Sequence, residues 1–366
     1  MHIGGKLAWR NNRLEDAAVA AKIRVGVLND MCDGPPPVGD ITPWLEREVA
    51  RVQAAGRLDA EVEFVPAYGL GLPTGTAEKV SQAFTALAAQ PDIVLIAGPA
   101  IGDNALIVTP MVEHWQVPTI NWAGAERARG EWMFHLQVGS HEDESLVIAR
   151  HLASAGAKRL GVVYDLSPIG TRHLEYPRDE AAIIGIELAS AEGISPLAED
   201  AGEAVAKALA AKPDGFVYLG LGLSAPAVAR ALTASGWQGP RMMNTAGLRG
   251  YDPKFSAACD GWRYIDMHSD GNLTLAALRA AEGISADKAV WAAKGHDFGR
   301  LVAEALARAR DWTREGVRKG LEQVKWLPAA EGTEGTTLGF GIQDRGALHG
   351  RYLVVRQWLG GRSVEL

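Results

Sequence analysis

The sequence predicts an α/β fold in which two doubly wound lobes each contain a parallel sheet. Short strand-like apolar runs alternate with segments of helical spacing from Ile23 to Met243, and this alternation predicts parallel sheets covered by helices on both faces. The run Ile93–Ala97 is apolar throughout, as expected for a strand that is buried on both faces. The alternation is interrupted near residues 122–140, so the predicted strands fall into two sets.

The first set of elements precedes that interruption. Helical spacing is clear in Pro43–Ala55, where Trp44, Leu45, Val49 and Val52 share one face. In chain order, the predicted strands and helices are Ile23–Leu28, Pro43–Ala55, Val62–Val65, Glu78–Ala89, Ile93–Ala97, Ala105–Trp115 and Thr119–Trp122. Each strand except the last is followed by a helix, as the α/β alternation requires.

The second set repeats this pattern, and the C-terminal part departs from it. The repeated elements are Glu144–Ala155, Leu160–Tyr164, Ala204–Ala211, Phe216–Leu219, Ala225–Ser235 and Arg241–Met243. A long helical pattern then covers Ala286–Arg310, and a helix at Thr313–Gln323 precedes the strand-like segments Thr336–Phe340 and Tyr352–Leu359. A chain that returns to helices after completing two sheets is expected to cross back between the lobes and to form a hinge with a cleft.

Functional residues are expected where the strands end, because open α/β sheets bind ligands outside the carboxyl ends of their strands. Those positions follow Leu28, Ala97, Ile120, Tyr164, Leu219 and Met243. Trp122 comes just past one strand end, and a flat ring at a cleft mouth offers a stacking surface for an apolar or aromatic ligand. Packing between the lobes is an equally good interpretation of this tryptophan.

Composition and charge argue against several classes of protein. The chain has 366 residues, 47% of them hydrophobic, and its net charge of −7 argues against a nucleic-acid binder or a protein held on anionic lipid. Two cysteines are too few for a disulfide framework, and no stretch is apolar enough to span a membrane. Residues 1–21 form a polar leader without the apolar core of a signal peptide. We therefore expect a periplasmic or cell-surface protein if an export signal is missing from this chain, and otherwise a cytoplasmic one.

One turn partly matches a dinucleotide-binding fingerprint. Gly220, Gly222 and Ala225 follow a predicted strand and open a helix, as in the pattern G-x-G-x-x-A. That fingerprint also needs an acidic residue about 20 positions later, and Met242–Thr245 contains no carboxylate. Glycines that let a turn approach the cleft closely are the favoured interpretation, and a nucleotide-dependent enzyme is the weaker alternative.

Two other polar clusters have structural interpretations. Residues 141–144 are one histidine and three acids that follow Ser140, so we expect a capped helix N-terminus there rather than a metal site. His296 and Asp297 lie within the long C-terminal helical pattern and are expected to be buried polar side chains rather than a catalytic dyad. Cys259 is expected in the core.

Several segments point to a known family by their order and spacing. They are Lys22–Leu28, Ile96–Pro99, Val117–Asn121, Leu160–Asp165, Gly250–Gly261 and Ala293–Arg300, the last with His296-Asp297 at a usual Tyr-Asp position. This arrangement resembles the type I periplasmic solute-binding proteins over about residues 22–361, specifically the leucine/isoleucine/valine-binding branch, which includes transport receptors and cytoplasmic amide sensors. The resemblance implies two lobes that are joined by a three-crossover hinge and close on a small molecule without catalysis.

The chain departs from this family where amino-acid-binding members hold the charged groups of the ligand. The hydroxyl-rich turn for the ligand carboxylate corresponds to Gly98–Asn104, with Asp103 where serines are common, and a carboxylate there would repel an anion. Ala246 stands at about the position of the acidic partner for the ligand ammonium, and Ile169 replaces a closing aromatic ring. Because unpaired buried charges are costly, we expect an aromatic or hydrophobic ligand rather than an ordinary amino acid.

The candidate ligand-binding residues combine the strand ends with this family comparison. They are Met31, Cys32, Tyr68, Ala100, Ile101, Asp103, Asn104, Asn121, Trp122, Ala123, Gly124, Leu166, Ile169, Leu221, Leu223 and Ala246. No catalytic residue, cofactor or metal ligand is predicted. The first expected lobe comprises residues 22–137 and 268–326, and the second comprises residues 138–267 and 327–366.

The function implied by the resemblance is that of a solute-binding protein of an ABC importer. A cytoplasmic ligand sensor or regulator of the amide-sensor type is the alternative. The expected partners are a small-molecule ligand and either an ABC permease or a regulatory protein. Neither nucleic acid nor membrane insertion is expected.

Overall fold

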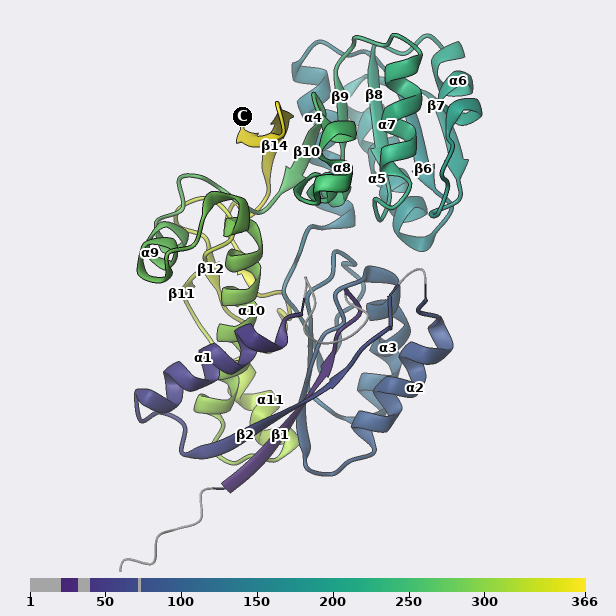
Figure 1. Cartoon of the computed structure of the whole chain (residues 1–366). Coiled ribbons are helices and arrows are strands. Elements are labelled where there is room, and N and C mark those ends of the chain that lie inside the picture. The colour runs from purple at the N-terminus through teal and green to yellow at the C-terminus, as the bar shows by residue number, and fades with distance from the viewer. Residues whose placement is uncertain (1–20, 32–39, 72–73) are drawn as a thin grey trace, which may run out of the picture.

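The molecule consists of two lobes, which lie one above the other in Figure 1. The computed structural model describes residues 21–31, 40–71 and 74–366, without the side chains of residues 253 and 254. Residues 1–20 of the predicted leader therefore lie outside the described residues, and Ala21 is already the first residue of a strand.

The first lobe contains a five-stranded sheet. Its elements are β1 (Ala21–Leu28), α1 (Thr42–Ala54), β2 (Ala60–Ala67), α2 (Ala77–Ala88), β3 (Ile93–Ala97), α3 (Gly102–Trp115), β4 (Thr119–Asn121) and β5 (Met133–His135). The strand order is β2-β1-β3-β4-β5, and every neighbouring pair is parallel. All five residues of β3 are buried, as its apolar sequence predicts.

Helices cover both faces of this first sheet. One face packs on α1 and on a helix from the C-terminal part, through Leu45, Val49, Phe298 and Leu301. The other face packs on α2 and α3, for example through Phe84. The sheet is therefore doubly wound, and the carboxyl ends of its strands face the second lobe (Figure 1).

The second lobe contains a seven-stranded sheet in the order β15-β14-β10-β9-β8-β6-β7. Its first elements are α4 (His141–Ser154), β6 (Arg159–Asp165), α5 (Pro168–Ile184), β7 (Glu187–Ile194), α6 (Gly202–Ala210), β8 (Gly215–Leu219), α7 (Ala225–Ala234), β9 (Arg241–Met243), the 3-10 helix η1 (Thr245–Tyr251), α8 (Pro253–Cys259) and β10 (Arg263–Asp266). Strands β10, β9, β8, β6 and β7, which are neighbours in this order, are parallel. One face of the second sheet packs on α4 and α5, and the other face packs on α6 and α7.

The C-terminal part returns to the first lobe before it completes the second. It contains α9 (Leu273–Glu282), η2 (Ala286–Lys288), α10 (Ala289–Arg308), α11 (Arg314–Glu322), β11 (Leu327–Pro328), β12 (Thr337–Leu338), β13 (Leu348–His349), β14 (Val354–Leu359) and β15 (Arg362–Glu365). Helices α10 and α11 and the small sheet β11-β12-β13 contribute to the first core. Strands β14 and β15 extend the second sheet, since β14 pairs antiparallel with β10 and β15 pairs antiparallel with β14. The chain crosses between the lobes three times, through residues 136–140, 267–272 and 350–353.

These three crossings are bonded to neighbouring segments and form the hinge. The Gly139 amide donates to Met267 Sδ over 3.1 Å, and the Gly332 amide donates to the Met267 carbonyl over 2.6 Å. The Thr333 amide donates to the Arg351 carbonyl over 2.9 Å. The predicted α/β fold with two doubly wound lobes and a three-crossover hinge is confirmed.

A buried group of charges lies beside the hinge, and we call Lys294, Glu331, Asp266 and Asp297 the hinge charge cluster. Lys294 Nζ is 3.0 Å from Glu331 Oε1 and 3.8 Å from Asp266 Oδ1, and all three side chains are at most 1% exposed. The Asp297 carboxylate accepts the amides of Ala330 and Glu331 at 2.9 Å. His296 binds Glu48 instead, so His296 and Asp297 are buried polar side chains with separate partners, as expected.

Several elements were not predicted, and one segment was expected in another lobe. Besides β5, α8, β10 and α9, the unpredicted elements include α5, which has Pro177 in its interior, and β7, an edge strand of mainly small and polar residues. The predicted helix at Ala286–Arg310 is divided into η2 and α10. Residues 327–349, which the predicted division assigns to the second lobe, contribute Leu338 and Leu348 to the first core. We therefore propose a division in which this segment belongs to the first lobe.

Candidate functional site

A cavity of about 530 Å³ lies between the lobes, and we call it the interlobe cavity. Its first-lobe wall follows the ends of β1, β3 and β4 and includes Met31, Ile101 and Trp122. Its second-lobe wall comes from α4, α5, the turn after β8 and η1. Both walls therefore lie at the carboxyl ends of parallel strands, where open α/β sheets bind ligands.

Half of the predicted ligand-binding residues line this cavity. They are Met31, Ala100, Ile101, Trp122, Gly124, Ile169, Leu221 and Ala246. The Trp122 ring stacks on Phe298 with centroids 5.6 Å apart, so this tryptophan both packs in the first core and contributes to the cavity wall. Its packing partner belongs to the first core, so this contact is not the packing between the lobes that was the alternative interpretation.

Three of the predicted polar residues bind within their own lobe instead. Tyr68 donates its hydroxyl to Asp40 Oδ2 over 2.9 Å. Asn104 Nδ2 donates to Asp30 Oδ2 and to a backbone carbonyl, and Asn121 Nδ2 donates to two backbone carbonyls. None of these three residues lines the interlobe cavity, because buried amides and hydroxyls take up partners in the surrounding loops.

The other predicted residues also lie away from the cavity lining. Leu166 is 61% exposed, Ala123 is fully buried and Leu223 is half-buried next to the turn after β8. Asp103 is in the first turn of α3, and the Ile169 amide of the second lobe favours the charged form of its carboxyl group. Cys32 lies outside the described residues. Cys259 is buried in the second core as expected, and burial raises the pKa of its thiol to about 11.

Most of the polar cavity wall was not predicted from the sequence. The additional lining residues are Gly102, Val138, His141, Glu144, His173, Gly220, Asn244, Thr245, Leu248, Arg249, Tyr251, Asp252, Trp291 and Lys294. Most of these residues belong to four helical elements, namely η1, α10, the first turn of α4 and the second turn of α5. The strand-end rule indicated Asn244 and Thr245, which follow β9 directly, but gave no signal for residues in helices.

The first turn of α4 is a capped helix N-terminus, as predicted. Ser140 Oγ accepts the Asp143 amide, and Glu144 Oε1 accepts the Ser140 amide over 2.7 Å. Glu144 Oε2 also accepts the Thr245 amide over 2.7 Å. The carboxylate of Glu144 therefore links α4 to η1 through hydrogen bonds. No group of histidine, cysteine or acidic side chains with metal-binding geometry occurs among the described residues.

Two histidines lie side by side in the cavity wall, with ring centroids 4.5 Å apart. His173 Nδ1 lies 2.9 Å from the Ile169 carbonyl, and His173 Nε2 lies 3.2 Å from Asn244 Nδ2 and 3.6 Å from Glu144 Oε2. Burial and the neighbouring His173 lower the pKa of His141 well below its usual value. The His141 ring is therefore not an anchor for an anionic ligand.

The turn after β8 holds a buried carboxylate where a dinucleotide-binding turn would hold phosphate. The Leu221 amide donates to Asp165 Oδ2 over 2.9 Å, and a Cβ at Gly220 would lie 2.2 Å from that oxygen. Gly220 therefore makes room for Asp165, whose negative charge would repel a pyrophosphate. This supports the interpretation of the glycines as a close approach to the cleft.

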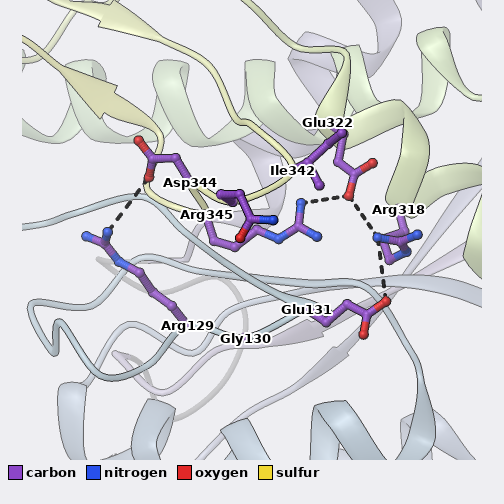
Figure 2. A pocket seen from close by; sticks show the side chains of 9 residues that line it. Arg129, Gly130, Glu131, Arg318, Glu322, Ile342, Asp344 and Arg345 are labelled. Atoms are coloured by element: carbon purple, nitrogen blue, oxygen red, sulfur yellow. Dashed lines mark hydrogen bonds and ion pairs between the residues drawn. The ribbon is translucent and has the colours of Figure 1, made fainter.

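A second cavity of about 730 Å³ lies on the first lobe, and its charges are already paired. Figure 2 shows its charged lining residues, which are Arg129, Glu131, Arg318, Glu322, Asp344 and Arg345. Glu322 lies 2.8 Å from both Arg318 and Arg345, Arg318 reaches Glu131 at 3.9 Å, and Arg129 reaches Asp344 at 4.0 Å. The interlobe cavity is therefore the better candidate for ligand binding.

Comparison with known proteins identifies the family. The sequence profile of a family described as periplasmic binding protein matches residues 22–356. The chain belongs to this family. The predicted resemblance is thereby confirmed, and a search of curated protein sequences finds no significant match. Among the described residues of this periplasmic binding protein, no helix is both long and apolar enough to cross a membrane.

Solved structures show that the periplasmic binding protein has the type I fold. A type 1 periplasmic binding protein from Bordetella pertussis is 17% identical, with a TM-score of 0.80 over 94% of this chain and 99% of that chain. A leucine-binding protein from Thermotoga maritima is 14% identical, with a TM-score of 0.75 over 94% and 97%. An ABC transporter substrate-binding protein from Desulfitobacterium hafniense, in complex with Leu, is 17% identical, with a TM-score of 0.74 over 94% and 100%.

Asp103 makes the stability of the protein depend on pH. Burial and the charge of Asp165 raise the pKa of Asp103 to about 6, although the Ile169 amide favours its charged form. A carboxyl group whose pKa is raised by folding destabilises the folded state at pH values above that raised pKa. This penalty disappears as the pH falls towards the pKa of the same group in the unfolded chain. We expect Asp103→Asn to raise the free energy of unfolding by about 1–3 kcal/mol at pH 8 and by much less at pH 4.5.

Urea unfolding of the wild-type protein and of Asp103→Asn at the two pH values measures this effect. The comparison is made between the two proteins at each pH, which removes the contribution of other titrating groups. A difference in free energy that is the same at both pH values would show that Asp103 does not carry the predicted penalty.

Proposed function

We propose that this periplasmic binding protein is the solute receptor of an ABC importer and that it closes its lobes on an aromatic or hydrophobic small molecule. The observation that carries the proposal is the interlobe cavity, which is lined from both lobes and has a volume of about 530 Å³. Cavities of about 300–1,000 Å³ suit small organic ligands. A ligand that contacts both lobes favours the closed arrangement, because only that arrangement provides both sets of contacts.

The wall composition supports an apolar ligand body. Three aromatic side chains line the cavity together with aliphatic ones, namely Trp122, Tyr251, Trp291, Met31, Ile101, Val138, Ile169, Leu221 and Leu248. These side chains favour a ligand with a hydrophobic or aromatic surface. The importer role and a location outside the cytoplasm follow the family, whose members among the solved structures include ABC transporter substrate-binding proteins.

An ordinary α-amino acid fits this wall poorly. Its ammonium group needs a carboxylate, and Ala246 occupies about the position where the family's amino-acid receptors place one. Glu144 lines the cavity, but its carboxylate already accepts the Ser140 and Thr245 amides. An ammonium bound there would compete with the hydrogen bonds that hold α4 to η1, which argues against a leucine or valine receptor.

Thermal unfolding across a panel of small molecules tests the proposed ligand class. We expect aromatic and apolar compounds to raise the Tm by several degrees at about 100 times Kd, which corresponds to about 2.7 kcal/mol of stabilisation. Small-angle X-ray scattering should show a smaller radius of gyration with the same compounds. Stabilisation by leucine or valine, without any by aromatic or apolar compounds, would overturn the proposal.

A further inference from the structure

Arg249 is a positively charged residue in the wall of the interlobe cavity. It lies in η1, close to the end of β9, and it is partly buried. Burial lowers the pKa of its guanidinium group, although the neighbouring Tyr218 and Asp252 act in the opposite direction. A guanidinium group remains protonated at neutral pH even so, so the cavity contains a positive charge that is partly withdrawn from water.

The guanidinium group of Arg249 has no partner in the described part of the chain. No described carboxylate lies within 4.0 Å of its nitrogens, and no described acceptor is hydrogen-bonded to them. Asp252 lines the same cavity and acts on Arg249 only at longer range. Two more deeply shielded arginines differ, since Arg345 pairs with Glu322 and Arg356 pairs with Asp270. An arginine that is partly buried without a carboxylate is costly, which points to a partner that the protein itself does not supply.

The turn after β8 makes space for this arginine. Gly222 has a φ of +96°, and a Cβ at this position would lie 3.0 Å from Arg249 Cγ. The second glycine of the false dinucleotide fingerprint therefore allows the aliphatic part of Arg249 to pack against the turn. The turn after β8 therefore packs directly against the side chain of Arg249.

A second donor in the same cavity also has no acceptor. The Trp122 indole is 6% exposed, and its buried Nε1 has no hydrogen-bond partner among the described residues. The one carboxylate of α4 that lines the cavity, Glu144, already accepts backbone amides. Arg249 is therefore an unsatisfied donor in the cavity wall, and neither of the two carboxylates that line the cavity, Glu144 and Asp252, is without a partner within the protein.

We propose that Arg249 binds the acid group of the ligand and that the ligand is an aromatic or hydrophobic monocarboxylate without an ammonium group. This inference rests on the proposed function and narrows its ligand class. Planar guanidinium and carboxylate groups form two parallel charge-assisted hydrogen bonds, which gives the ligand a fixed orientation. The apolar part of the ligand then contacts the aromatic and aliphatic wall.

Isothermal titration calorimetry with matched ligands tests this assignment. The probes are 3-phenylpropanoate, 3-phenylpropanamide and phenylalanine, together with the corresponding benzoate and phenylacetate pairs. We expect an acid to bind roughly ten- to a hundredfold more tightly than its amide, since hydrogen bonds to a charged group contribute about 1.5–3 kcal/mol. Arg249→Gln should remove this preference, and Arg249→Lys should retain part of it. Arg310→Gln, at an exposed position outside the cavity, is the matched control.

The stability of the ligand-free variant gives an independent result. Because Arg249 has no partner without ligand, Arg249→Gln should leave the Tm unchanged or raise it, whereas a structural role would lower the Tm. Equal affinity for acids and amides in the wild-type protein would overturn the assignment of Arg249 and leave the proposed function in place. Tight binding of phenylalanine, or binding of none of the aromatic probes, would overturn both.

Discussion

We expect Lys294→Met to lower the free energy of unfolding by about 3–5 kcal/mol. Lys294 is the only described cation within 4.0 Å of Glu331 and Asp266, and all three side chains are at most 1% exposed. Burial opposes the charged form of Lys294, but Glu331 and Asp266 outweigh it and raise the pKa of its ammonium group. Removing the ammonium leaves carboxylates in the interior without their counter-charge, and urea unfolding measures the loss.

A surface lysine provides the matched control for this substitution. Lys319 is 60% exposed and pairs with Glu315 on the same helix, so Lys319→Met should cost less than about 1 kcal/mol. Adding Glu331→Gln to Lys294→Met should recover part of the lost free energy of unfolding, because it removes one of the unpaired carboxylates. Burial and the charge of Glu331 also raise the pKa of Asp297 to about 8, and the same second substitution relieves that repulsion. Equal costs for the two lysine variants would show that the hinge charge cluster is not a source of stability.

The fold was largely predictable because its strands and most helices have strong periodic patterns. Continuous apolar runs such as Ile93–Ala97 and Phe216–Leu219 become fully buried strands, and their order along the chain determines a doubly wound sheet. The pattern failed at α5, where polar residues and Pro177 hide the helix, although Ser167 caps its start. Residues 327–349 have no comparable pattern, since two-residue strands have no periodicity that assigns them to a lobe.

Only half of the predicted site residues line the cavity. The ends of strands locate the backbone turns of the site, but they do not show which polar side chains face the cavity. Ala100, Ile101 and Leu221 follow strands and line the cavity as predicted. Asn104 lies in the first turn of α3 and Asn121 is the last residue of β4, but their amides bind neighbouring carbonyls. That choice of partner depends on loop conformations that no local sequence pattern specifies. Arg249 and Lys294 lie on helical segments, and only the three-dimensional arrangement brings them to the cavity.

A contact between the two lobes, made by Glu126, is expected to have the second large effect, which is on ligand affinity. Glu126 follows β4 in the first lobe, and its Oε1 accepts hydrogen bonds from Arg172 Nη2 at 2.9 Å and from the Tyr176 hydroxyl at 2.8 Å. Both partners are on α5 of the second lobe. Burial opposes ionisation of Glu126, but these hydrogen bonds outweigh it and lower its pKa. The bridge is therefore present at neutral pH and is lost only as the pH falls through this lowered pKa.

We expect Glu126→Ala to weaken ligand binding roughly ten- to a hundredfold, because the bridge stabilises the closed arrangement by about 1.5–3 kcal/mol and none of its residues lines the cavity. Glu175 pairs with the same Arg172 but lies on the same helix, so Glu175→Ala should change affinity less than about twofold. Calorimetry with an aromatic ligand measures both variants. If both substitutions weaken binding equally, Arg172 acts within α5 alone. If neither does, the bridge makes no contribution to closure, and the ligand alone holds the lobes together.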